Sequence, residues 1–280
     1  DVLGFSPELP TPFPLKNPLS DDHTIMRPSM IPALFSVAER NVRMGADSLR
    51  FFEIGTLFQK GPDGAPVETQ GIALFMNGPA TPASWHAMET PRFDIYHLRG
   101  ILEALIPRGL RLEPSEHPTL MLAARVFADD VQVGWMGQAQ PARAREIGIT
   151  GPALVAELDL HLLETHSLGR ATQFAELAKF PGSTRDIAMF VPATLPNGEL
   201  NQFFSSLTEP LLESFQVFDV FVASAKSTDE SDESDELARK SIAYSLTYRD
   251  ESRTLQATEI DEAHGRVLDA LKNALPVEIR

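Results

Sequence analysis

The sequence predicts an α+β protein of two domains. In the first part, strand-like segments outnumber helical ones and come in pairs joined by short turns, which favours a mostly antiparallel sheet with helices on one side. The second part alternates strands and helices in a different order. Between them, Phe180-Pro181-Gly182-Ser183 is a cluster of chain-breaking residues of the kind that separates domains. We therefore expect one domain over residues 1–177 and another over residues 178–280.

Composition limits the classes of function. The chain has 280 residues, 43% of them hydrophobic, and no apolar run approaches the roughly 20 residues that cross a bilayer. It has no cysteine, which excludes disulfides, cysteine zinc sites and thiol nucleophiles and fits a cytoplasmic protein. The net charge of −15 argues against a broad basic surface for nucleic acid, so any RNA contact must rest on a local cluster. Because the chain starts at Asp1 with a linker-like segment, we expect a fragment of a longer protein.

In the first domain, a helix begins near Ser29, a good N-cap residue, and one of its faces is apolar. That face consists of Ile31, Leu34, Phe35 and Ala38. Alternating and β-branched residues predict strands over residues 49–58, 70–76, 125–128, 131–135 and 153–160. Two further helices are predicted over residues 93–102 and 141–147, the first with Tyr96, Leu98, Ile101, Leu102 and Leu105 inward. Residues 125–135 form a hairpin around Asp129-Asp130.

The second domain has a clearer order. Strands are predicted over residues 185–191, 215–223, 241–248 and 277–280, and helices over residues 197–207 and 258–275. This βαββαβ order is that of the ferredoxin-like fold, in which the first and third strands are central neighbours. Thr258 and Asp261 resemble a capping box at the start of the last helix. The acidic run from Ser227 to Glu236 predicts a mobile hairpin tip.

Motifs for catalysis or metal binding are missing from the sequence. Phosphate-binding glycine loops, nucleophile elbows and HExxH spacings do not occur. His161 and His166 are five residues apart, which does not place them on one helical face. Glu157 and Asp159 share one face of a strand and could pair, although strand carboxylates are more often solvated or salt-bridged. We expect no catalytic residues and no metal site in this chain.

Basic residues gather at the ends of the first and third strands of the second domain. They are Arg185, Arg239, Lys240, Arg249 and Arg253. Because those strands are central neighbours, the cations could lie near one edge of the sheet and bind RNA phosphates. The alternative is that Arg185–Asp186 and Arg249–Asp250 are local ion pairs that hold loops. The residues alone leave both interpretations open.

Several segments of the second domain resemble one family. They are Phe180-Pro181, Arg185-Asp186-Ile187-Ala188, Phe218-Asp219-Val220-Phe221, Lys240-Ser241-Ile242-Ala243 and Arg253-Thr254-Leu255. In order and spacing, these segments resemble the C-terminal anticodon-binding domain of the phenylalanyl-tRNA synthetase β subunit. The first domain resembles the core that precedes it in the same subunit. The segments that carry this are Asn17-Pro18-Leu19-Ser20, Met26-Arg27-Pro28-Ser29, Phe52-Glu53-Ile54-Gly55, Asp94 to Gly100 and Gly134-Trp135-Met136-Gly137.

The resemblance implies a class II synthetase-like antiparallel sheet domain without catalysis, followed by a ferredoxin-like anticodon-binding domain. Its implied partners are the catalytic α subunit, in an (αβ)₂ heterotetramer of the cytoplasm, and tRNA(Phe), with no membrane. ATP and Mg²⁺ are expected for the complete ligase and no cofactor for this fragment. In catalytic class II domains a late glycine-rich strand ends in an arginine that binds ATP phosphates. The matching residues 153–161 contain neither, and Glu157 and Asp159 would repel ATP.

Two features depart from the family. In the family, a glycine often occurs shortly after the His-Pro pair. In this chain, His117-Pro118 is followed by Thr119-Leu120-Met121-Leu122. The acidic run lies on a predicted RNA-binding domain, so we expect its tip to point away from the phosphates. Two other functions remain as alternatives: a stand-alone RNA-binding adaptor that uses the ferredoxin-like domain, and a small-molecule regulatory module, which rests on fold analogy alone.

Overall fold

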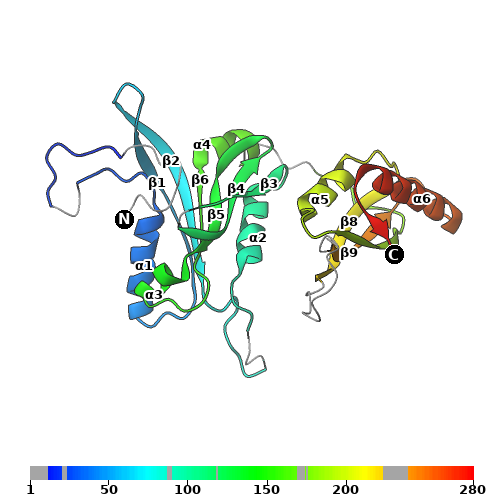
Figure 1. Cartoon of the computed structure of the whole chain (residues 1–280), viewed down its shortest axis with the longest axis horizontal. Coiled ribbons are helices and arrows are strands. Elements are labelled where there is room, and N and C mark those ends of the chain that lie inside the picture. Colours follow the sequence, from blue (N-terminus) through cyan, green and yellow to red (C-terminus); the bar gives the residue numbers. More distant parts are fainter. Residues whose placement is uncertain are drawn as a thin grey trace, which may run out of the picture. The chain divides into compact units, whose positions relative to one another are not determined.

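The computed structural model describes residues 12–20, 24–86, 90–117, 119–168, 174, 176–222 and 239–280. The chain divides into two compact units, Asp1–Thr172 and Gln173–Arg280, called unit 1 and unit 2 here (Figure 1). Each unit is described by itself. The predicted acidic tip, residues 227–236, lies outside the described residues.

Unit 1 is built on a six-stranded antiparallel sheet with the order β1-β2-β6-β5-β4-β3. Its strands are β1 (Leu49–Lys60), β2 (Pro66–Asn77), β3 (Leu110–Pro114), β4 (Leu120–Ala128), β5 (Val131–Ala139) and β6 (Leu154–Asp159). Its helices are α1 (Ile31–Arg43), α2 (Ile95–Leu105), α3 (Pro141–Glu146) and α4 (Leu160–Leu163), followed by the π-helical turn η2 (Glu164–Leu168). The predicted antiparallel sheet is confirmed. The sequence analysis missed β3 and α4.

Helices cover both faces of this sheet, so the prediction of helices on one side was wrong. On one face α1 and α3 pack through Leu34, Phe35 and Ala144. On the other, α2 and α4 pack through residues such as Leu102 and Leu163. The reason lies in the central strands, because every residue of β2 from Gly71 to Asn77 is buried, with no alternation. A strand that is apolar on both sides needs cover on both.

The helix α2 begins at a capping box that the sequence analysis did not identify. The Asp94 side chain accepts hydrogen bonds from the backbone N–H groups of Tyr96 and His97 at 3.0 and 3.1 Å. Leu98 and Leu102 are fully buried as predicted, but Tyr96 is 72% exposed and its predicted inward position was wrong. Tyr96 precedes Leu98 by two residues, roughly 200° around a helix of 3.6 residues per turn, so the two cannot share a face.

The segment where a family glycine was expected contains a residue in the left-handed region. Leu122 has φ 49° and is 64% exposed, next to an irregularity in the pairing of β4 with β5 between Met121 and Ala124. Left-handed backbone is unfavourable for residues with a Cβ and easy for glycine. The chain thus keeps at Leu122 a conformation that glycine would adopt without strain.

Unit 2 confirms the predicted βαββαβ order. Its elements are β7 (Ser183–Pro192), α5 (Asn197–Ser206), β8 (Leu212–Val222), β9 (Arg239–Tyr248), α6 (Ala257–Ala274) and β10 (Glu278–Ile279). The sheet order β10-β7-β9-β8 makes the first and third strands central neighbours, as expected. The predicted capping box of Thr258 and Asp261 was wrong, because α6 starts earlier and Gln256 with Glu259 forms the box.

Both helices of unit 2 pack on the same face of its sheet. The buried residues of β7 are Ile187, Met189 and Val191, and they contact α5 and α6 residues in one core. Side chains alternate along a strand, so the intervening residues point to the opposite face. We call this opposite side the open face, since no helix within the described part of unit 2 packs there (Figure 1).

Candidate nucleic-acid interface

The five predicted tRNA-binding cations lie at two ends of the unit 2 sheet. They are Arg185, Arg239, Lys240, Arg249 and Arg253. In the antiparallel register of β7 and β9, Arg185 is opposite Leu246 while Arg239 is opposite Pro192. The seven residue-to-residue steps from 185 to 192 span about 23 Å at the usual rise of a strand. The expectation of a single cluster was wrong, because Arg185 and Arg239 both lie near the start of their strands, and antiparallel strands start at opposite ends.

Each of these cations has a partner inside unit 2. The ion pairs are Arg185–Asp261 at 2.9 Å, Arg239–Glu278 at 2.8 Å, Arg249–Glu213 at 2.8 Å and Arg253–Glu259 at 2.6 Å. Arg249 also donates to the backbone carbonyl of Phe180. The alternative that named Asp186 and Asp250 as the partners of Arg185 and Arg249 therefore chose the wrong acceptors. The observed pairs join different elements of the unit.

Lys240 contacts backbone carbonyl groups instead of a carboxylate. Its Nζ donates to the carbonyl oxygen of Ala193 at 3.2 Å and to that of Leu195, in the turn between β7 and α5. A half-buried ammonium with two carbonyl acceptors holds that turn in place. Near the other end of β9, the Arg253 guanidinium and the backbone N–H of Gln256 lower the pKa of Glu259 to about 2. Both arrangements are intramolecular.

Strand alternation separates Arg239 from the other cations. Arg185 and Lys240 have the same parity as the core residues Ile187 and Ile242 and therefore point to the helix-covered side. Arg249 and Arg253 follow β9 in the segment that leads to α6. Arg239 has the parity of the open face, and its side chain is 62% exposed. Of the five cations, Arg239 alone shares a strand face with the uncovered side of the sheet.

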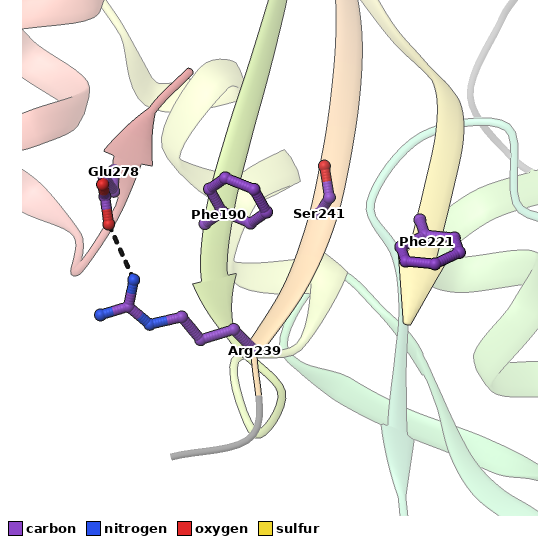
Figure 2. Close-up of a pocket in the computed structure, with 5 residues that line it drawn as sticks. All are labelled: Phe190, Phe221, Arg239, Ser241 and Glu278. Carbon is purple, nitrogen blue, oxygen red and sulfur yellow. Dashed lines mark hydrogen bonds and ion pairs between the residues drawn. The ribbon is translucent and has the colours of Figure 1, made fainter. Parts of the chain in front are cut away.

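A row of four residues crosses the open face at the level of Ser241. In the register, Glu278 of β10 is opposite Phe190 of β7, and Ser241 of β9 lies between Phe190 and Phe221 of β8. These residues and Arg239 line a shallow pocket of about 230 Å³. Figure 2 shows the two rings on either side of Ser241, with the Arg239 side chain crossing β7 to reach Glu278.

The chemistry of this face differs from that of a basic patch. Two aromatic rings flank a small hydroxyl side chain, and Asp219, two residues before Phe221 and opposite Ala243, belongs to the same face. Acidic groups therefore accompany Arg239 on this face. Such a surface suits planar rings with hydrogen-bonding edges better than it suits a row of phosphates.

The sequence analysis missed Phe190, Ser241 and Phe221 as site residues, although it quoted the segments that contain Ser241 and Phe221. The segments Phe218-Asp219-Val220-Phe221 and Lys240-Ser241-Ile242-Ala243 indicate the family, but by themselves they do not indicate which strand face each side chain occupies. Had the buried positions of β7 and β9 been fixed first, period-two alternation would have placed Ser241 and Phe190 on the opposite side. No sequence rule places Phe221, because the β8–β9 pairing is irregular between Val217 and Asp219.

In unit 1 the two carboxylates considered as a pair each hold a different helix. The Glu157 Oε1 atom accepts the backbone N–H of Met30 at 2.6 Å, at the start of α1, and burial raises the pKa of Glu157. Asp159 accepts the backbone N–H of Leu162 at 2.9 Å and caps α4. The predicted N-cap was one residue too early, because the N-cap of α1 is Met30, although Ser29 accepts the backbone N–H of Ile31 at 3.1 Å. These groups stabilise helix starts.

Within the described ranges, the structure shows neither a metal-binding group nor a membrane-spanning helix. No group of three or more His, Asp or Glu side chains there could hold a metal ion. No helix there has the length and apolar character needed to span a bilayer.

The chain was compared with known protein families and structures. The family model of the phenylalanyl tRNA synthetase beta chain CLM domain matches residues 6–160, and that of the ferredoxin-fold anticodon binding domain matches residues 178–280. A solved structure of a pyrrolysyl tRNA synthetase from Desulfitobacterium hafniense is similar over 53% of this chain and 52% of its own, with 20% identity and a TM-score of 0.40.

Curated relatives match along nearly the whole chain. A phenylalanine–tRNA ligase beta subunit from Xanthomonas campestris is 32% identical over 95% of this chain and 33% of its own length. One from Bacillus subtilis is 30% identical over 94% of this chain and 32% of its own. The chain thus spans about a third of the length of these relatives. The resemblance noted in the sequence is confirmed, and the chain belongs to the phenylalanyl-tRNA synthetase β-chain family.

Proposed function

We propose that the chain is the C-terminal part of the β subunit of a phenylalanine–tRNA ligase, and that the open face of unit 2 contacts the anticodon region of tRNA(Phe). The observation that carries this is the uncovered strand face with Phe221, Ser241 and Arg239 at one level of the sheet. It lies within residues 178–280, which match an anticodon-binding family.

The residues of this face suit an unpaired base. Stacking of a base on an aromatic side chain contributes roughly 1–3 kcal/mol and tolerates any base. The Ser241 hydroxyl and the Asp219 carboxylate supply hydrogen-bond partners for a base edge. Arg239, 62% exposed, supplies a guanidinium for a phosphate. Single-stranded loops, whose bases can be splayed outward, are the RNA elements that such a surface recognises.

The five cations predicted from sequence remain part of the proposal, but we expect them to contribute unequally to RNA binding. Arg239 lies on the open face with an exposed side chain, so it can contact a phosphate. All four arginines, Arg239 included, would share any RNA contact with a carboxylate partner, and Lys240 is already bound to two carbonyl oxygens. Each phosphate contact adds roughly 0.7–0.9 to the slope of log affinity against log salt concentration. We therefore expect a slope that corresponds to about one phosphate contact and not to five.

The proposal assigns the adenylation chemistry to the α subunit. The strand β6 carries no arginine, and its carboxylates Glu157 and Asp159 are engaged at helix starts. ATP and Mg²⁺ belong to the complete ligase in this proposal, and the assembly would be cytoplasmic. The chain alone should form no phenylalanyl-adenylate. Phenylalanine-dependent exchange of pyrophosphate into ATP by the purified chain would contradict this.

An apolar strip on unit 1 supports assembly with another subunit. The edge strand β1 exposes Phe52 and Ile54, 63% and 52% accessible, on one face. The helix α1 contributes little, since its apolar stripe is buried and only Val37, at 39%, is exposed among the described apolar residues of that helix. Exposed apolar residues in contiguous positions are typical of interfaces. We propose that β1 contacts the α subunit within an (αβ)₂ assembly.

The tRNA proposal is tested by fluorescence anisotropy with the matching tRNA(Phe). Phe221→Ala should weaken binding by about 5- to 150-fold, the equivalent of one stacked base. Val220→Ala is the control, because Val220 is 53% exposed on the same strand and points to the other face. Equal affinity of both variants and the wild type would overturn the proposal.

A separate experiment decides between the ligase and the stand-alone adaptor. The chain is mixed with the α subunit of the same organism and run on a sizing column. A shared peak, lost when Phe52 and Ile54 are both replaced by Ser, supports the assembly role. Separate elution together with unchanged tRNA binding favours the adaptor.

A further inference from the structure

We propose that Phe190 is a second stacking platform, so that the open face holds two successive unpaired bases of the RNA, one on Phe221 and one on Phe190. This inference rests on the proposed function and adds to it the number of bases bound and the residues that receive the second. Phe190 lies in the cross-strand row with Ser241 and Phe221 and lines the same pocket (Figure 2).

The spacing of the two rings favours two bases over one. Phe190 and Phe221 are on strands separated by one other strand, so their Cα atoms lie about 9.6 Å apart at the usual strand spacing. A single base held between two rings needs them about 6.8 Å apart, twice the 3.4 Å step of stacked bases. Figure 2 draws the rings on opposite sides of Ser241, and this separation favours one base on each ring over a single base between them. Each ring can stack with its own base, because the small side chain of Ser241 leaves space between the two rings.

The surroundings of Phe190 supply polar contacts to a base placed on it. Glu278 is its neighbour in the row, and the Arg239 guanidinium donates to the Glu278 carboxylate at 2.8 Å. Figure 2 shows this ion pair bordering the Phe190 ring. The pair offers a carboxylate oxygen for base N–H groups and guanidinium N–H groups for base oxygens or a phosphate. A base that carries exocyclic N–H donors is favoured at this position.

The pair also orients Arg239. An exposed arginine samples many rotamers, and holding it in one geometry costs side-chain entropy. The bond to Glu278 favours the rotamer that places the guanidinium beside Phe190 before RNA arrives. We expect Glu278→Gln to weaken binding to about the same extent as Arg239→Gln, and the double variant to add little, because both residues act through one contact.

The test uses the whole 280-residue chain and a stem-loop with the anticodon loop of the matching tRNA. Loop positions are made abasic one at a time. The wild type should lose about 5- to 150-fold in affinity at each of two adjacent positions. In Phe190→Leu, one of these positions should become insensitive to base removal, and in Phe221→Leu the other. Phe190→Tyr, which restores an aromatic face, should regain the wild-type pattern.

The controls distinguish a loss of folding from a loss of stacking. They also distinguish failure of the second stacking platform from failure of the proposed function. Leucine keeps most of the apolar volume of Phe190, and the unfolding midpoint of each variant shows whether unit 2 is intact. If Phe190→Leu keeps both sensitive positions while Phe221→Leu loses one, the second platform is wrong and the proposed function stands. If the wild type binds the stem-loop no better than an unrelated hairpin, both are overturned.

Discussion

The two sheets of this protein differ in how many of their faces are covered. In unit 1, α1 and α3 cover one face and α2 and α4 the other, and the central strand β2 is buried throughout its second half. In unit 2, α5 and α6 cover a single face. Both faces of the first sheet are therefore used for packing. One face of the second sheet remains available, and its side chains can contact a ligand.

The polar residues follow the same division. In unit 1, Glu157 and Asp159 lie on a central strand, and both bind backbone N–H groups at helix starts. In unit 2, Ser241 and Arg239 lie on a central strand whose outer side is uncovered. A carboxylate beneath a helix is available only to that helix, whereas a hydroxyl on an open sheet remains available to a partner. The same type of strand position thus serves packing in one unit and recognition in the other.

The largest expected effect tests the covered sheet. Phe75 is fully buried, with ring centroids 5.3 Å from Phe35 and 5.2 Å from Phe51. Phe75→Ala should lower the free energy of unfolding of unit 1 by about 3–5 kcal/mol, because it leaves a cavity under α1. Denaturant unfolding measures this. Phe52→Ala, on an exposed site, is the control and should change stability by about 0.5 kcal/mol or less. Equal losses would contradict the assignment of the two positions.

The next effect compares the two faces of unit 2. Lys240→Met should destabilise unit 2 by about 2 kcal/mol, since two backbone carbonyls lose a charged donor. Arg239→Met removes an ion pair whose members are 62% and 67% exposed, which should cost about 0.5 kcal/mol or less. Thermal or denaturant unfolding checks both. A larger loss for Arg239→Met would mean that the open face, and not the covered one, stabilises the unit.

A third prediction concerns the pH dependence of unit 1. Burial raises the pKa of Glu157 above its ordinary value of 4.5, so the folded state favours the protonated carboxyl. Its contribution to stability is complete below about pH 4.5 and is lost as the pH rises through the folded-state pKa. Glu157→Gln stays neutral and keeps an acceptor for Met30. The stability of the wild type minus that of this variant should fall as the pH rises from 4 to 7, and a constant difference would refute the shift.

The smallest effect is expected in the strained segment of β4. Leu122→Gly should raise the stability of unit 1 by about 0.5–1 kcal/mol, because relief of a left-handed residue exceeds the added flexibility of glycine in the unfolded chain. Leu122→Ala, which keeps a Cβ, should give no such gain. Urea unfolding of the three proteins decides this. Equal stability of the glycine and alanine variants would mean that the backbone carries no strain there.

Much of the fold follows from local pattern. The alternation of Ile187, Met189 and Val191 identifies the first strand of unit 2, and the spacing of Leu98 and Leu102 identifies the buried side of α2. The prediction failed where an assignment depended on the position of another element. Tyr96 was placed inward from its apolar character, and the cations were placed together from their nearness to strand ends. Antiparallel register, which separates Arg185 from Arg239, follows from pairing between distant segments.

The sequence by itself determined the order of the elements in unit 2, the family and the lack of a catalytic motif, because these depend on residue type and spacing along the chain. The tertiary structure decided which faces of the two sheets are covered, which acceptors hold the arginines, and that Phe190, Ser241 and Phe221 form one row. The physical reason is that a side chain's surroundings are set by packing and by strand register, and register is a property of paired segments that one segment cannot specify alone.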